Sequence, residues 1–189
     1  MTTLIPIMNE NNQSLKIENI VASGSIADTI DLEMISAKIE TCELNKKRFP
    51  GAVYRIQNPK MAILIFSSGK VVMTGVKSQE DLTCGLDILI QKMKEVGVTC
   101  HDTPGVAITN MVCSYDIGAK INLNKMIMSL SLERIEYEPE QFPGLVYRIE
   151  NPKVVALVFS SGKIILTGGK NMEDVEKGLA VLEQKIFSI

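Results

Sequence analysis

The sequence predicts an α+β protein made of two tandem, pseudo-symmetric repeats, with four helices and about ten antiparallel strands. Residues 49–77 and 142–170 are identical at 19 of 29 positions, at a constant offset of 93. Each segment holds β-rich runs separated by Asn-Pro and Ser-Ser-Gly turns, and an amphipathic helical pattern follows each. A duplication this close predicts two copies of one structure related by a pseudo-twofold axis.

The repeat extends beyond its best-matched part. Residues 17–23 (IENIVAS) align with residues 108–114 (ITNMVCS) at an offset of 91. The N-terminal residues lack the basic start and the continuous apolar stretch of a secretory signal. We therefore expect a short flexible N-terminal lead-in at 1–15, a first repeat at 16–100 and a second at 105–189.

Within each repeat, the apolar spacing predicts a strand, a short helix, four antiparallel strands and a long helix. Asp31 and Asn122 are the expected N-caps of the short helices, and Ser78 and Asn171 those of the long helices. The long helices are predicted from apolar residues that recur at helical spacing. These are Leu82, Leu86, Leu89, Met93 and Val96 in the first repeat, and Val175, Leu179, Leu182 and Ile186 in the second.

The composition is that of an ordinary globular protein, with 46% hydrophobic and 22% charged residues among 189. No apolar run approaches the roughly 18–20 residues of a membrane span, so no membrane partner is expected. The four cysteines form no CxxC pair and there is one histidine, which argues against structural zinc. We expect no metal and no cofactor, and we expect Cys84 and Cys113 to be reduced thiols in the core.

The charge is distributed unevenly along the chain. A net charge of −2 counts against nucleic-acid binding, for which basic domains are the rule. However, residues 49–77 contain four cations and no acid, and residues 142–170 contain four cations and one acid, Glu150. A duplicated basic set with almost no acids indicates a surface that faces an anion.

The predicted strands are apolar on both faces. In residues 154–159, Val155, Leu157 and Phe159 share one face, and Ala156 and Val158 share the other. Two helices per repeat can cover only one face of an antiparallel sheet. The other apolar face must meet a second sheet, another subunit or a ligand, and a sheet sandwiched in a dimer is the simplest alternative to a ligand.

The motif FPGLVYRIENPK…LVFSSGKIILTG, its earlier twin and the segment IENIVAS resemble the core of the TATA-box-binding protein family. The resemblance spans about residues 16–189, and the acidic balance without a long N-terminal extension is similar to the archaeal form. It implies a saddle, with a curved antiparallel sheet of about ten strands against the DNA minor groove and four helices on the convex face. It also implies a non-enzymatic general transcription factor that bends the A·T-rich TATA element of double-stranded promoter DNA. Such a factor recruits transcription factor B and, through it, RNA polymerase.

The resemblance assigns roles to residues at matched positions in the two repeats. Four of the five phenylalanines match the family's wedges, which unstack a base step at each end of the site: Phe49, Phe66, Phe142 and Phe159. Asn19 and Asn110 match its central asparagines, and Thr74 and Thr167 add hydroxyl donors beside them. The minor groove of A·T pairs offers acceptors to such donors, whereas a G·C pair would project its amino group into the contact.

The remaining matched positions form an apolar floor and a basic rim. The floor residues, expected against sugars and bases, are Val21, Leu64, Val72, Val112, Leu157 and Ile165. The expected phosphate contacts are Arg55, Lys70, Lys77, Arg148, Lys163 and Lys170.

The two repeats differ most just before the FPG motif. The first carries Lys46, Lys47 and Arg48, whereas the second carries three acids, Glu136, Glu138 and Glu140. We call the loop before each FPG motif a stirrup. The resemblance implies that transcription factor B docks on the second stirrup, so Glu138 and Glu140 are the expected partner contacts. Clustered acids would repel phosphate, and a basic protein partner is the better use for them.

Other functions fit the sequence less well. An enzyme is disfavoured by the single histidine, the lack of a glycine-rich phosphate loop and the lack of a repeated carboxylate pair. A dimeric scaffold that does not bind DNA would have no use for paired Asn/Thr donors and a basic rim, although the apolar face would allow a homodimer without DNA. A specialised paralogue would look the same, since Pro50 and Met111 depart from the usual family residues. An archaeal factor would be cytoplasmic and nucleoid-associated, and a eukaryotic one nuclear.

Overall fold

The computed structural model describes residues 14–130 and 134–188, so most of the expected lead-in, residues 1–13, lies outside the described residues. The elements of the first repeat are β1 (Lys16–Ser25), α1 (Leu32–Lys38), β2 (Cys42–Leu44), β3 (Ala52–Gln57), β4 (Lys60–Ile65), β5 (Lys70–Val76) and α2 (Gln79–Glu95). Those of the second are β6 (Ala107–Asp116), α3 (Leu123–Ser129), β7 (Ile135–Glu136), β8 (Leu145–Ile149), β9 (Val154–Val158), β10 (Lys163–Gly169) and α4 (Met172–Phe187).

The strand order in the sheet is β2-β3-β4-β5-β1-β6-β10-β9-β8-β7. Neighbouring strands within each repeat pair antiparallel. The described residues thus confirm the predicted fold class, with two tandem repeats, ten strands and four helices in the expected order. The chain divides into two compact units, one covering Ile17–Val112 and one built on the residues from Cys113 onwards, and each is described by itself.

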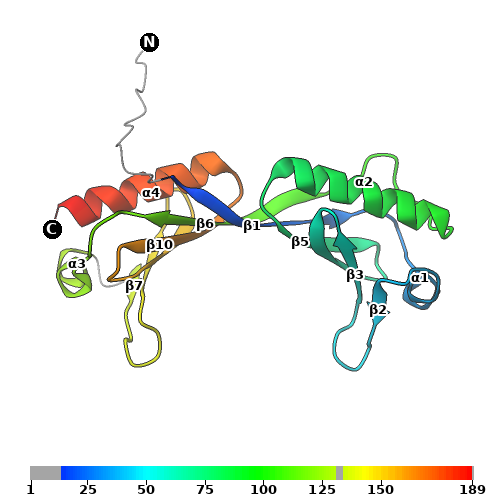
Figure 1. Ribbon diagram of the computed structural model, residues 1–189, viewed down its shortest axis with the longest axis horizontal. Coiled ribbons are helices and arrows are strands. Elements are labelled where there is room, and N and C mark those ends of the chain that lie inside the picture. The colour runs from blue at the N-terminus through cyan, green and yellow to red at the C-terminus, as the bar shows by residue number, and fades with distance from the viewer. Residues whose placement is uncertain (1–13, 131–133, 189) are drawn as a thin grey trace, which may run out of the picture. The chain divides into compact units, whose positions relative to one another are not determined.

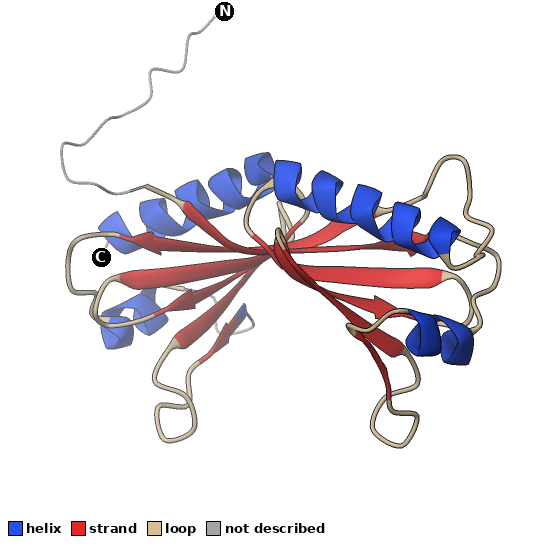
Figure 2. Ribbon diagram, turned by 45° about the vertical axis from the view of Figure 1, so that its right-hand side comes forward, coloured by secondary structure: helices blue, strands red, loops and turns tan. Residues whose placement is uncertain are grey.

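In each unit the long helix lies against one face of that unit's own strands (Figures 1 and 2). In the first unit, Ile63, Ile65 and Met73 point to this face and are fully buried together with Leu89 and Met93 of α2. The same buried layer in the second unit consists of Ala156, Val158, Ile164, Leu166, Val175 and Leu182. We call the strands of one repeat a half-sheet. One face of each half-sheet therefore packs into the core beneath its long helix.

All four predicted N-caps are confirmed. The Asp31 carboxylate accepts hydrogen bonds from the backbone N–H groups of Glu33 and Met34, both at 3.0 Å. The side chains of Asn122, Ser78 and Asn171 each accept one from the residue three positions on, at 3.1, 3.1 and 2.8 Å. Each cap satisfies backbone donors that have no partner within the helix.

The predicted core needs one correction. Cys113 is buried as expected, but Cys84 is exposed, because it lies on α2 beside rather than within the stripe that faces the sheet. That stripe also includes Gly85, and its match Gly178 lies in the same place on α4. A Cβ at Gly85 would overlap the Met61 sulfur and one at Gly178 would press on Val154 at 3.2 Å, so both glycines allow the helix to approach the sheet closely.

No helix among the described residues is long and apolar enough to cross a membrane.

Candidate nucleic-acid interface

The face of each half-sheet opposite its long helix is apolar and only half-buried. In the first repeat the strands alternate buried and half-buried residues, and the half-buried ones share this open face. Val53 is paired with Leu64, which in turn is paired with Val72, so the three form one row across β3, β4 and β5. Val21 of β1 is paired with Thr74, which continues the surface to the edge of the repeat.

The second repeat presents the same surface. Val146, Leu157 and Ile165 form a row across β8, β9 and β10, and Val155 is paired with Thr167. Val112 lies at the matched half-buried position of β6. The six predicted floor residues thus form two matched sets of three, one on each open face, and Val155, Leu157 and Phe159 are half-buried as the alternation predicts.

A polar pair lies at the inner end of the first apolar row. The Asn19 amide nitrogen donates to the Thr74 hydroxyl at 3.0 Å, and its carbonyl oxygen accepts from the Gly75 backbone N–H at 2.8 Å. These two contacts fix which end of the amide is the donor. Asn110 and Thr167 take the matched positions on β6 and β10.

The four predicted wedges form two edge-to-face pairs. The ring centroids of Phe49 and Phe66 are 5.5 Å apart, and those of Phe142 and Phe159 are 5.7 Å apart. The FPG glycine is required here because the first ring of each pair lies over it. A Cβ on Gly144 would come within 2.7 Å of the Phe142 ring. The geometry brings together residues 17 positions apart and holds them at an angle.

The basic residues surround these features. All six predicted phosphate contacts are exposed. Lys70 follows Gly69, which has a φ of 77°, in a turn closed by a 2.9 Å hydrogen bond from the Phe66 backbone N–H to the Lys70 carbonyl. The second repeat closes the same turn between Phe159 and Lys163 at 2.9 Å. Each of these lysines is therefore fixed by the backbone beside a wedge.

Two predicted phosphate contacts are held by acids that sequence reasoning missed. The Lys77 ammonium lies 3.0 Å from Glu18, and the Arg148 guanidinium lies 2.8 Å from Glu136. Both acids come from outside the matched basic segments. Strand pairing was the missing signal, because Glu136 pairs with Val146, two residues from Arg148.

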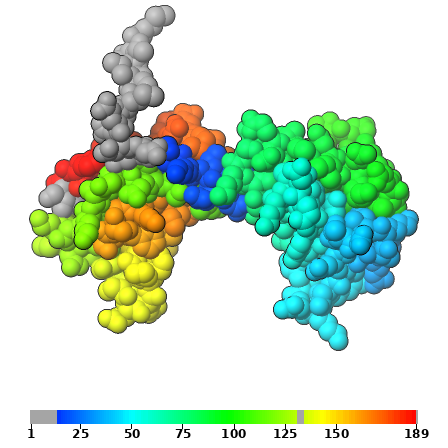
Figure 3. Space-filling view, in the orientation of Figure 1, coloured from blue at the N-terminus to red at the C-terminus, as the bar shows by residue number. Residues whose placement is uncertain are grey.

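The two stirrup loops have the same backbone turn and opposite charge. In the first, the backbone N–H groups of Arg48 and Phe49 both donate to the Asn45 carbonyl at 3.0 Å. In the second, those of Gln141 and Phe142 both donate to the Glu138 carbonyl at 2.9 Å. Glu138 and Glu140 are exposed, and each loop forms a projecting tip on its own repeat (cyan and yellow in Figure 3).

Within residues 14–130 and 134–188, no group of three or more His, Cys, Asp or Glu side chains could hold a metal ion. What the arrangement offers instead is apolar area, amide and hydroxyl donors, and exposed cations. This is the chemistry of a surface that binds a polyanion with an apolar interior.

Comparison with known proteins identifies the family of this chain. The chain matches the family model described as "Transcription factor TFIID (or TATA-binding protein, TBP)" twice, at residues 14–96 and 105–189. It is 48% identical over 176 residues to TATA-box-binding protein 1 of Methanosarcina acetivorans, covering 93% of this chain and 96% of that one. It is 49% identical over 175 residues to the TATA-box-binding protein of Archaeoglobus fulgidus, with the same coverage.

A solved structure shows the same fold. The structure of Methanococcus jannaschii TBP superposes with a TM-score of 0.83 at 43% sequence identity, covering 93% of this chain and 99% of that one. The two tandem matches to the family model and the identity to these relatives establish the family of the chain. It is a family of transcription factors and not of enzymes. The chain belongs to the TATA-binding protein family.

Proposed function

We propose that this protein is a general transcription factor that binds the minor groove of A·T-rich TATA promoter elements, bends the DNA, and recruits transcription factor B and RNA polymerase. One observation carries the proposal. Each repeat has an open apolar face, with an Asn/Thr donor pair at one end, a phenylalanine pair at the other and exposed cations around it. The relatives that share this architecture are named TATA-box-binding proteins.

The donor pairs account for the base preference. The Asn19 carbonyl oxygen accepts from the Gly75 N–H, and one amide hydrogen is donated to the Thr74 hydroxyl, so the second hydrogen of the amide N–H₂ is the one left to face a ligand. A·T and T·A pairs both present acceptors in the minor groove, whereas G·C adds an amino donor that would oppose this N–H₂. A·T-rich DNA is therefore the better partner in either orientation of each base pair.

The wedges account for bending. A phenylalanine pair inserted at a base step adds apolar contact and forces the stacked bases apart. Unstacking costs about a few kcal/mol per step, a general figure for minor-groove-bending proteins, of which this family is itself an example. Contact of the bent duplex with the apolar rows and with the six cations offsets that cost.

The acidic stirrup accounts for recruitment. Glu138 and Glu140 are exposed on a loop whose basic counterpart in the first repeat has the same backbone turn. A basic surface of transcription factor B is the partner that suits these acids, and it would give direction to a pseudo-symmetric complex. The relatives are archaeal, and in an archaeal cell the protein would be cytoplasmic and associated with the nucleoid. Its two functional repeats would span residues 16–100 and 105–189.

A binding titration tests the proposal. The protein is titrated into a 16-base-pair A·T-rich duplex and into a G·C-rich duplex of equal length at the same stated salt concentration. We expect at least about 100-fold tighter binding to the A·T-rich duplex, since each mismatched pair typically costs about 1–3 kcal/mol. Equal affinities, or a dimer that persists unchanged in the presence of DNA, would instead support the scaffold reading of the apolar face.

A further inference from the structure

The linker between the two repeats, residues 97–106, is fixed to the segment that follows β1. The backbone N–H of His101 donates to the Ile26 carbonyl at 2.8 Å, and that of Gly105 donates to the Ser25 carbonyl at 3.1 Å. All of these residues belong to the first unit, so both hydrogen bonds lie within one compact part of the molecule. The backbone of the linker is therefore held against the first repeat.

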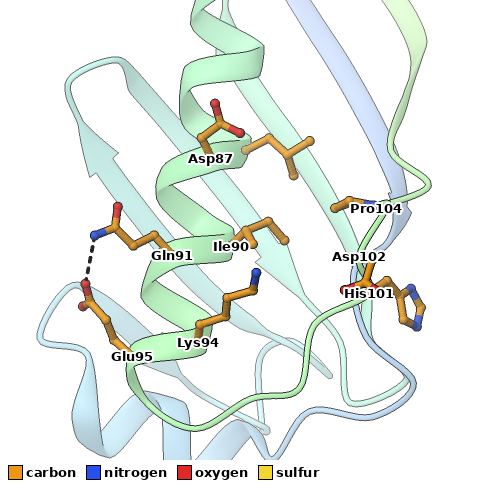
Figure 4. Close-up of a pocket in the computed structure, with 9 residues that line it drawn as sticks. Asp87, Ile90, Gln91, Lys94, Glu95, His101, Asp102 and Pro104 are labelled. Atoms are coloured by element: carbon orange, nitrogen blue, oxygen red, sulfur yellow. Dashed lines mark hydrogen bonds between the residues drawn. The ribbon is translucent and has the colours of Figure 1, made fainter.

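A side-chain contact adds to these two hydrogen bonds. The Nε2 atom of His101 lies 3.1 Å from a carboxylate oxygen of Asp28. Figure 4 shows His101 on the linker, with its ring directed away from α2. The chain has a single histidine, and the second repeat has Ala119 at the position that matches Asp28. This contact is therefore particular to the first repeat.

The segment that holds the linker also supports residues 66–70, which we call the wedge turn because they begin with a proposed wedge and end with a proposed phosphate contact. The backbone N–H of Ile26 donates to the Gly69 carbonyl, and that of Ile30 donates to the Ser67 carbonyl, both at 2.9 Å. Ile26 is thus bonded to the linker through its carbonyl and to the wedge turn through its N–H. A single buried residue joins the two.

Glycines allow these backbones to approach closely. Gly69 has a φ of 77°, and a Cβ there would overlap the Ala27 carbonyl oxygen. A Cβ on Gly24 would overlap the Gly105 carbonyl oxygen of the linker. Ala27 is fully buried, whereas the matched Gly118 is exposed. Because packed interiors transmit strain, a displacement of the linker should reach the wedge turn through this segment.

The second repeat fills the place of the linker with its own side chain. Tyr115 matches Gly24, so its ring takes the place that Gly105 takes in the first repeat. Tyr115 donates a hydrogen bond to Glu183 of α4, and burial followed by this hydrogen bond raises the pKa of Tyr115 to about 12. The support of the wedge turn thus comes from the linker in one repeat and from a side chain of the repeat itself in the other.

We propose that the linker is a brace that positions the wedge turn of the first repeat for DNA binding, with His101 and Gly105 as its positioning residues. The proposal rests on the proposed function, which supplies the wedge role of Phe66 and the phosphate role of Lys70. A surface that is already held in its binding arrangement binds more tightly, because less order has to be imposed on association. The brace gives a role in DNA binding to a linker that lies beside α2 and not on the open apolar face.

Fluorine NMR of the free protein tests the brace without DNA. The chain has five phenylalanines, so full replacement by fluorophenylalanine gives five resonances, which single substitutions by leucine assign. Gly24→Ala should displace the linker and so shift or broaden the Phe66 resonance. Asp28→Ala should have the same effect to a smaller degree, since an exposed pair contributes little. The resonances of the two wedges in the second repeat should stay unchanged in both variants.

Two further variants are matched controls. Asp28→Asn keeps an oxygen that can accept a hydrogen bond from the His101 ring, and it should leave the Phe66 resonance in place. Ala119→Asp adds the acid at the matched exposed position of the second repeat, where the sequence offers no histidine. It should leave all five resonances unchanged. The thermal unfolding midpoint verifies that each variant is folded.

Titration with an A·T-rich duplex measures the consequence for DNA binding. Gly24→Ala should weaken affinity by about threefold to tenfold, because apparent affinity falls with the fraction of molecules whose wedge turn is in the binding arrangement. Asp28→Ala should cause a smaller loss, and both controls should bind as the wild type does. A wild type without preference for A·T-rich DNA would contradict the proposed function, and the fluorine resonances would still decide whether the linker holds the turn.

Three results would overturn the proposal. A Phe66 resonance that neither Gly24→Ala nor Asp28→Ala changes would show that the linker does not hold the wedge turn. Changes of equal size in the wedges of both repeats would show a general loss of structure. A changed Phe66 resonance with wild-type DNA affinity would show that the linker contacts the turn without positioning it for DNA.

Discussion

The two repeats share a fold and the chemistry of their open apolar faces but differ in the charge of one loop. The wedge pairs have centroid separations of 5.5 and 5.7 Å, and the turns that carry Lys70 and Lys163 close with identical hydrogen-bond lengths. The loops before the wedges keep the same turn, yet one carries three cations and the other two acids, Glu138 and Glu140. The residues of the two repeats agree on the surface proposed to face one pseudo-symmetric ligand, and they differ in the loop proposed to tell the two repeats apart.

The largest expected effect comes from reversing that difference. Glu138→Arg with Glu140→Arg should leave binary DNA binding intact or slightly stronger and should weaken the ternary complex with transcription factor B by at least about 100-fold, because like charges across an interface cost several kcal/mol. Gel shifts with and without factor B measure both. The matched control, Lys46→Glu with Lys47→Glu, should spare the ternary complex. A double mutant that still forms the ternary complex at wild-type concentrations would show that polarity is set elsewhere.

The next largest effect concerns the wedges. Phe142→Ala or Phe66→Ala should reduce DNA bending and weaken affinity by about 10- to 100-fold, since the energy that offsets unstacking is lost. The effect on folding should be smaller for Phe142, which is 37% exposed. Energy transfer between probes at the ends of a short duplex reports the bend. Unchanged energy transfer in both mutants would show that these phenylalanines do not bend the DNA.

The phosphate contacts should give a smaller and more uniform effect. Lys70→Ala and Lys163→Ala should each flatten the slope of log K against log salt by about one unit and weaken binding to A·T-rich and mixed DNA equally. Lys177→Ala provides the control, since this exposed lysine on α4 lies 2.6 Å from Glu173 on the helix side. An unaltered slope for Lys70→Ala would place this lysine away from the DNA backbone.

Internal repetition made most of the fold and much of the candidate site predictable from sequence. A cap or strand expected in one repeat could be checked against the other, which is why all four caps and ten strands are confirmed. Features that depend on side chains from separate segments were missed. A cysteine such as Cys84 can lie on either the buried or the exposed side of α2. Only the packing of Gly85 on Met61 shows which side is buried. The ion pairs of Lys77 and Arg148 with acids outside the basic segments were likewise invisible to pattern reasoning.

The smallest expected effect tests the Arg148–Glu136 pair, which is an electrostatic difference between repeats that are otherwise alike. Glu43 matches Glu136 and pairs with Val53 as Glu136 pairs with Val146, yet Glu43 forms no ion pair in the described part of the chain. Under the proposed function, a phosphate would therefore compete with a carboxylate for Arg148 but not for Arg55. Exposed ion pairs contribute little, so Glu136→Gln should raise affinity for A·T-rich DNA by only about twofold to fivefold.

The matched Glu43→Gln variant makes that small effect interpretable. Both variants remove one acid from the same register of an edge strand, and long-range electrostatics should therefore change equally in the two. If affinity rises more in Glu136→Gln, the surplus measures competition between Glu136 and phosphate for the Arg148 guanidinium, and Arg148→Lys should diminish it because an ammonium lacks the planar set of donors of a guanidinium. Equal gains in the two variants, measured at one salt concentration, would show that the pair has no role in DNA binding and that only net charge matters.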